Sequence, residues 1–65
     1  MNVSIKFDGY FYAIGDDTFC YSFDKMINQW VYHDPSRRIW PVWNEDKIQL
    51  LNNARRKVKL EKLLA

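Results

Sequence analysis

Apolar and polar residues alternate in the first part of the chain. From Val3 to Phe7 the apolar side chains fall on one side and Ser4 and Lys6 on the other, which is typical of a half-buried strand. Asp8-Gly9 follows and favours a two-residue hairpin turn, because both central residues of that turn need positive φ. We therefore expect Tyr10–Ile14 to return as a second strand antiparallel to the first.

A second turn and a third strand continue this pattern. Gly15-Asp16 suits a tight turn, and Thr18 to Phe23 is the expected third strand. The predicted register pairs Phe7 with Tyr10 and Tyr12 with Phe19. One face then holds Val3, Ile5, Phe7, Tyr10, Tyr12, Ile14, Phe19, Tyr21 and Phe23, and the other face a small apolar island of Phe11, Ala13 and Cys20. A one-residue slip would scatter the large set, so pattern and register support each other.

A second hairpin is predicted from Gln29–His33 and Arg38–Val42. Between them, residues 34–37 indicate a type I turn with Asp first and Pro second. Pro41 marks the last strand as an edge, because proline cannot donate a hydrogen bond to a neighbouring strand. Strand alternation points Trp40 away from Pro41 and Trp43, so we expect Trp40 and Trp43 on different faces.

A helix is predicted from Asn44 to Ala65. Asn44 is a favourable N-cap, acidic residues follow it, and the rest of the segment lacks Gly and Pro. At 100° per residue, one half of this helix carries Ile48, Leu50, Leu51, Ala54, Val58 and Leu64, while Leu60 and Leu63 fall outside that stripe. The predicted fold is therefore α+β: an antiparallel meander or small open barrel of about five strands, SH3-like or similar, over residues 1–43, followed by a basic amphipathic helix over 44–65.

Length and composition restrict the class of protein. A chain of 65 residues forms one domain with a single core, too small for the two-layer α/β architecture of most cofactor enzymes. An apolar fraction of 48% and an aromatic fraction of 17% exclude intrinsic disorder. A lone cysteine, no apolar run long enough to span a membrane and no signal-peptide pattern at the N-terminus predict a cytoplasmic protein that does not insert into membranes.

Charge is distributed unevenly along the chain. Residues 1–46 contain four basic and seven acidic side chains, a net charge of −3, and residues 47–65 contain six basic and one acidic, a net charge of +5. Cations near the end of a helix complement its dipole, and solvated Lys and Arg are ordinary on an outer face. The alternative interpretation is a patch for phosphates or for an acidic protein surface.

Catalytic chemistry is nearly absent from the sequence. Cys20 and His33 are the only thiol and imidazole; we expect Cys20 to be an inert core residue and His33 to be solvated or to cap a turn. Asp16 and Asp17 are interpreted as turn formers. The sequence has neither the Cys and His spacing of a metal site nor a glycine-rich phosphate loop. We therefore predict a protein that is not an enzyme and has no cofactor or metal.

Two functional hypotheses follow. The first is a protein-binding module, such as the small inhibitors or modulators that phages and mobile elements encode, with homodimerisation through the helix as a variant. The second is nucleic-acid binding by the basic helix and an exposed aromatic side chain. Trp40 is the predicted exposed indole, and the candidate partner-binding residues are Arg37, Arg38, Trp40, Arg55, Arg56, Lys59, Leu60, Lys62 and Leu63.

Two architectural likenesses accompany these hypotheses. A small barrel followed by a helix resembles the seven-kilodalton archaeal chromatin proteins, whose sheets are rich in lysine where this one is acidic. The segment Trp30–Pro35 is similar to the middle strands of arm-type integrase DNA-binding domains. Both likenesses concern architecture, so neither assigns a function to an individual residue.

Overall fold

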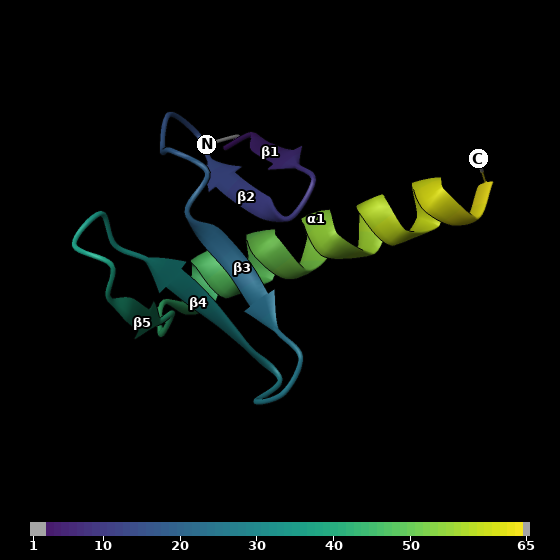
Figure 1. Ribbon diagram of the computed structural model, residues 1–65. Helices are drawn as coiled ribbons and strands as arrows, with labels where there is room; N and C mark the ends of the chain where they lie inside the picture. The colour runs from purple at the N-terminus through teal and green to yellow at the C-terminus, as the bar shows by residue number, and fades with distance from the viewer. Residues whose placement is uncertain (1–2, 65) are drawn as a thin grey trace.

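The computed structural model describes residues 3–64, which form one five-stranded antiparallel sheet followed by one helix (Figure 1). The strands are β1 (Ile5–Asp8), β2 (Phe11–Ile14), β3 (Tyr21–Asp24), β4 (Gln29–His33) and β5 (Ile39–Pro41), and the helix is α1 (Glu45–Leu64). The five strands lie side by side in sequence order, so β1 and β5 are the two edges of an open sheet. The α+β prediction is confirmed. Ala65, the last residue of the predicted helix, lies outside the described residues.

The first hairpin keeps the predicted faces but has a different register. Phe7 pairs with Tyr12 rather than with Tyr10, and Asp8 pairs with Phe11. The loop is therefore Gly9-Tyr10, with Gly9 (φ 60°) at its first central position. Because the pairing moves by two residues, and side chains alternate with a period of two, Ile5, Phe7 and Tyr12 remain on the core face. Tyr10 is displaced to the hairpin tip.

The second connection is longer than predicted. Tyr12 pairs with Tyr21 instead of Phe19, so residues 15–20 form a loop and β3 begins only at Tyr21. Within this loop the amide of Asp17 donates to the carbonyl of Ile14 at 2.9 Å, which closes a turn around Gly15 (φ 59°). Three residues predicted for the core lie outside the strands and are exposed. Val3 (40%) precedes β1, Tyr10 (65%) is in the first hairpin loop, and Phe19 (42%) is in the 15–20 loop.

The turn between β4 and β5 has the predicted type and one additional feature. The amide of Arg37 donates to the carbonyl of Asp34 at 2.9 Å, and the amide of Ser36 donates to Asp34 Oδ1 at 3.1 Å. Arg37 then adopts φ 68°. A type I turn followed by a left-handed residue is a common three-residue hairpin loop, in which glycine usually takes the left-handed position. Arg37 holds a backbone conformation that its side chain disfavours.

The core lies between one face of the sheet and the first half of α1. Trp30 is 2% exposed and meets the Tyr12 ring edge-on, with centroids 5.1 Å apart, and the Phe23 ring with centroids 5.4 Å apart. From the helix, Leu51 is fully buried against this cluster. The helix starts as predicted, because Asn44 Oδ1 accepts a hydrogen bond from the amide of Lys47 at 3.1 Å.

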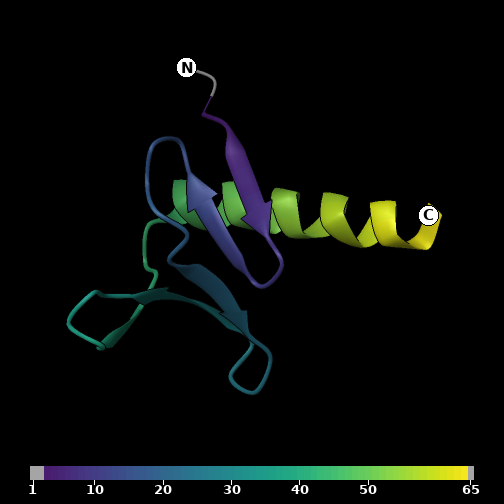
Figure 2. The same cartoon turned by 45° about the horizontal axis from the view of Figure 1, so that its top comes forward.

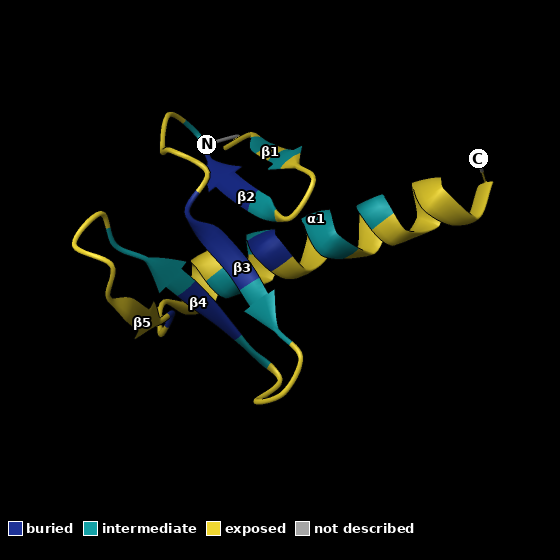
Figure 3. Ribbon diagram, in the orientation of Figure 1, coloured by how far each residue is buried: buried dark blue, intermediate teal, exposed yellow. Residues whose placement is uncertain are grey.

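The helix packs against the sheet only along its first part and then extends beyond it (Figures 1 and 2). Burial along α1 falls off after Val58, and the last turns are exposed (Figure 3). Leu64, predicted for the packed stripe, is 87% exposed, because the sheet does not reach that far. Leu60 and Leu63 are exposed as expected. Leu64 is exposed because it lies beyond the edge of the sheet, although its helical phase matches that of the packed residues.

The face of the sheet that α1 does not cover is also partly buried. Ala13 and Ser22 are 1% and 2% exposed there. Ser22 Oγ and His33 Nε2 lie 2.7 Å apart in a hydrogen bond, and the His33 ring meets Phe11 edge-on. The prediction of a solvated or turn-capping His33 is wrong, because its ring is partly buried and packs against Ser22 and Phe11 of neighbouring strands. Cys20 is buried in the core as predicted, but it belongs to the main core cluster and not to the opposite face.

Candidate functional site

An aromatic groove of about 450 Å³ lies between the 15–20 loop, β5 and the start of α1. We call this surface the aromatic groove. It is lined by Asp17, Thr18, Cys20, Tyr21, Tyr32, Trp40, Pro41, Val42, Trp43, Asn44 and Lys47. Tyr21 and Tyr32 pair across β3 and β4 with ring centroids 5.5 Å apart, and both tryptophans are exposed. The groove therefore combines broad aromatic surface with a few polar groups, as small binding sites on proteins commonly do.

Two ionisable groups of the aromatic groove, the Tyr21 phenol and the Cys20 thiol, are held in their uncharged forms. Its hydroxyl donates to Asp17 Oδ2 at 3.2 Å, and the ammonium of Lys47 lies 6.0 Å from the ring centroid. Burial, with the nearby Asp17 carboxylate, raises the pKa of Tyr21 to about 12. Burial also raises the pKa of the Cys20 thiol. Both groups are consequently protonated at neutral pH, and the thiol is a poor nucleophile.

Trp40 lies in this groove with 46% of its surface exposed, as predicted for an accessible indole. Its Nε1–H donates to Asp34 Oδ2 at 3.2 Å, which ties the ring to the preceding turn. A backbone hydrogen bond from Ser36, followed by that indole hydrogen bond, lowers the pKa of the Asp34 carboxyl. Arg37 and Arg38 are exposed on the same hairpin. The indole is thus held by a charged partner while its face remains available.

Trp43 is the residue that sequence reasoning missed. It is 77% exposed, more than Trp40, and it lines the same groove. The expectation that the two indoles lie on different faces is wrong, because β5 ends at Pro41 and residues 42–44 no longer follow strand alternation. The signal available in the sequence was Pro41 itself, which is followed by the helix cap Asn44 only three residues later.

A second surface adjoins the first and carries positive charge. One groove of about 470 Å³ and a neighbouring one of about 290 Å³ share Asn52 and Arg55. We call them together the cationic surface; it is lined by Phe23, Asn28, Gln29, Trp30, Val42, Trp43, Ile48, Asn52, Arg55, Arg56 and Lys59. The Arg55 guanidinium stacks over the Phe23 ring, 4.0 Å from its centroid. Trp43 forms the boundary between this surface and the aromatic groove.

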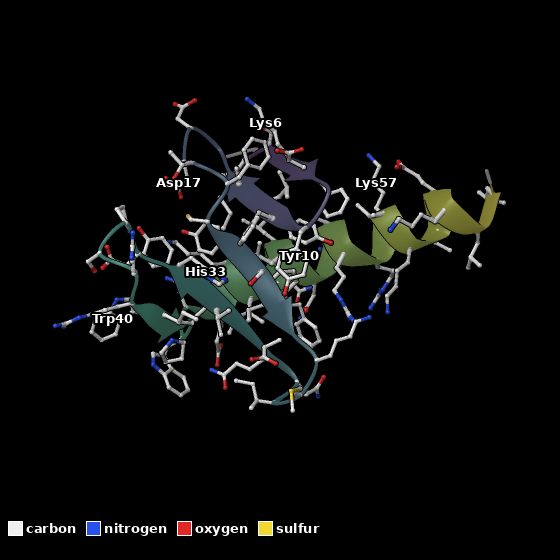
Figure 4. The ribbon with its side chains drawn as sticks, viewed as in Figure 1. Lys6, Tyr10, Asp17, His33, Trp40 and Lys57 are labelled. Atoms are coloured by element: carbon white, nitrogen blue, oxygen red, sulfur yellow. The ribbon has the colours of Figure 1, made fainter. Side chains whose placement is uncertain are left out.

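The predicted partner-binding residues therefore divide into three groups. Trp40, Arg37 and Arg38 belong to the β4–β5 hairpin, whereas Arg55, Arg56 and Lys59 line the cationic surface on α1. Lys62, Leu60 and Leu63 are exposed nearer the end of the helix and line neither groove. In Figure 4, Trp40 and the helix residue Lys57 lie at opposite ends of the molecule, so the tryptophan predicted to act with the helix cations is not near that part of the helix.

Groups with catalytic potential do not gather in either groove. Ser22 and His33 form a hydrogen-bonded hydroxyl–imidazole pair, but the serine is 2% exposed and neither residue lines a groove described above. Across residues 3–64, no three His, Cys, Asp or Glu side chains are placed so that they could hold a metal ion together. No helix in that part of the chain has both the length and the apolar character needed to cross a bilayer.

Comparison with protein-family models, with curated proteins and with solved structures finds no match to this chain. The proposed function therefore rests on the fold and on the two surfaces of this chain.

Proposed function

We propose that this protein is a protein-binding module that contacts its partner through the aromatic groove. The observation that carries the proposal is the pair of exposed indoles, Trp40 and Trp43, beside the two tyrosines of the groove. Tryptophan and tyrosine contribute most of the binding energy in many protein interfaces, because each buries a large area with few rotatable bonds. A small inhibitor or modulator of another protein needs a surface of this kind and no catalytic group.

The character of the groove supports a polypeptide partner. Its polar lining groups, including Thr18, Asn44 and the tyrosine hydroxyls, are suited to the carbonyl and amide groups of a main chain. Its charges are mixed, since Asp17 and Lys47 lie at the same site, so neither a strongly acidic nor a strongly basic ligand is selected. The protonated Cys20 thiol and the lack of a histidine among the lining residues support binding over covalent chemistry.

Substitution of one groove residue tests the proposal. The tagged protein, Trp40→Ala and Ile39→Ala are each used to capture partners from the cytosolic fraction of the source cells. Ile39 is the matched control, because it is adjacent, apolar and 61% exposed but does not line the groove. We expect a protein retained by the unmodified chain and by Ile39→Ala to be lost with Trp40→Ala, whose melting temperature should change little.

Two results would contradict this assignment. If no captured protein depends on Trp40, the aromatic groove is not the interface. If Trp40→Ala lowers the melting temperature substantially, the indole has a structural role instead. Light scattering on the same sample tests the homodimer: a dimer disrupted by Leu63→Ala would place the partner on the exposed helix end and identify it as a second copy of this chain.

A further inference from the structure

We propose that the cationic surface binds single-stranded nucleic acid, with a base stacked on Trp43 and the backbone phosphates held by Arg55, Arg56 and Lys59. This site shares only Val42 and Trp43 with the lining of the aromatic groove. The combination of an exposed indole with a group of cations is the arrangement that proteins use to bind single strands without sequence preference.

The charge of the lining residues favours an anionic ligand. Arg55, Arg56 and Lys59 all line this surface, and within residues 3–64 none of its lining residues is acidic. The acidic residue next to it in the chain, Asp24, uses its Oδ1 to accept a hydrogen bond from the amide of Met26 at 2.9 Å. The charged side chains that line this surface are therefore all positive, which favours an anionic ligand.

The arrangement of these cations matches an extended chain of phosphates. Arg56 and Lys59 are three residues apart on α1, so they lie on neighbouring turns of one helix face, with a rise between them of about 4.5 Å. Stacking over Phe23, with the guanidinium carbon 4.0 Å from the ring centroid, orients Arg55 before any ligand arrives. A row of cations along one helix face suits consecutive phosphates of an extended strand.

The aromatic and amide groups of this surface favour a nucleic acid over an acidic peptide. Trp43 exposes 77% of its surface, which leaves the indole accessible for stacking with a base. Asn28, Gln29 and Asn52 line the same groove, and side-chain amides present the paired donor and acceptor groups that match base edges. A duplex keeps its bases stacked on one another, so only a single strand can place a base on Trp43.

Fluorescence anisotropy of a labelled ten-nucleotide oligo(dT) tests the proposal with the intact chain. Binding at low salt should weaken as salt rises, with a log–log slope of about −0.7 for each phosphate contact. Arg56→Gln/Lys59→Gln should reduce the magnitude of that slope by about 1.4. The control Lys6→Gln/Lys57→Gln removes the same charge from exposed positions that do not line the surface (Figure 4) and should keep the original slope.

Stacking is tested separately with two substitutions of Trp43. Trp43→Ala should weaken oligo(dT) binding by about tenfold, and Trp43→Phe should recover most of the affinity, because a phenyl ring still stacks. Trp40→Ala should leave oligo(dT) binding unchanged, which distinguishes this site from the protein-binding groove. Circular dichroism confirms that each variant is folded.

Three results would overturn the proposal. The first is no binding of oligo(dT) at low salt, and the second is an equal loss of slope in both double variants. The third is equal competition by polyglutamate of matched charge, which would show a general polyanion surface or an acidic-protein interface rather than a nucleic-acid site.

Discussion

The indole Nε1–H of Trp30 donates a hydrogen bond to Oδ1 of Asn52, which lies 22 residues later in the chain, and the two atoms are 2.7 Å apart. The donor belongs to a nearly fully buried side chain of β4, and the acceptor is the eighth residue of α1. This contact fixes the helix to β4, the strand next to the β5 edge of the sheet. Because Asn52 also lines the cationic surface, the same residue connects the core to a candidate binding site.

Removal of the acceptor should destabilise the protein. Asn52→Ala leaves the Trp30 N–H without its partner, which costs about 1–3 kcal/mol when the donor is buried. Asn53→Ala is the control, because it brings the same gain in helix propensity at an exposed position. Urea denaturation of both variants should show the loss only for Asn52→Ala. Equal stabilities would mean that water satisfies the indole and that the contact does not fix the helix.

Leucine truncations along α1 should distinguish its packed part from its projecting part. Leu51→Ala removes a fully buried side chain and should cost about 2–5 kcal/mol, enough to unfold much of a domain of this size. Leu63→Ala, at 81% exposure, should change the free energy of unfolding by no more than about 0.5 kcal/mol. Thermal melts followed by circular dichroism measure both. A large loss for Leu63→Ala in a dilute sample would mean that the helix end is buried in an oligomer.

The left-handed backbone at Arg37 predicts a stabilising substitution. Arg37→Gly removes a strain of about 1–2 kcal/mol, partly offset by the flexibility that glycine adds to the unfolded chain, so a net gain of up to about 1 kcal/mol is expected. Arg38→Gly, whose φ is not positive, should instead lower stability. Guanidinium denaturation compares the two. A loss with Arg37→Gly would show that the Arg37 side chain makes a stabilising contribution larger than the strain.

The raised pKa of Tyr21 predicts a loss of stability at alkaline pH. The folded protein holds the phenolic proton more tightly than the unfolded chain does, so the contribution is complete below about pH 10 and disappears as pH rises to about 12. Tyr21→Phe should flatten the fall in melting temperature over this range. The raised pKa of Tyr12 should leave a smaller residual slope. Tyr10→Phe, at the exposed hairpin tip, should keep the original profile, and an unchanged profile for Tyr21→Phe would contradict the assignment.

Local patterns in the sequence were sufficient to predict the order and type of the elements. β4 has the predicted bounds, Asn44 caps the helix, and residues 34–37 form the predicted turn, because each depends on residues close together in the chain. The core face of the first hairpin was also predictable. A pairing shifted by two residues exposes the same side of each strand, so the pattern specifies the face without specifying the partner.

Only the tertiary structure decided which strand residues pair, how far the sheet covers the helix, and which side chains lie together in the grooves. The pairing of Tyr12 with Tyr21 depends on how long the loop between their strands becomes, and the exposure of Leu64 depends on where the sheet ends. The two grooves depend on Trp43, which leaves strand alternation after Pro41 and so comes to lie beside both Trp40 and the helix surface of Arg55. Each of these outcomes joins segments distant in the chain, and periodicity within one segment carries no information about what packs against it.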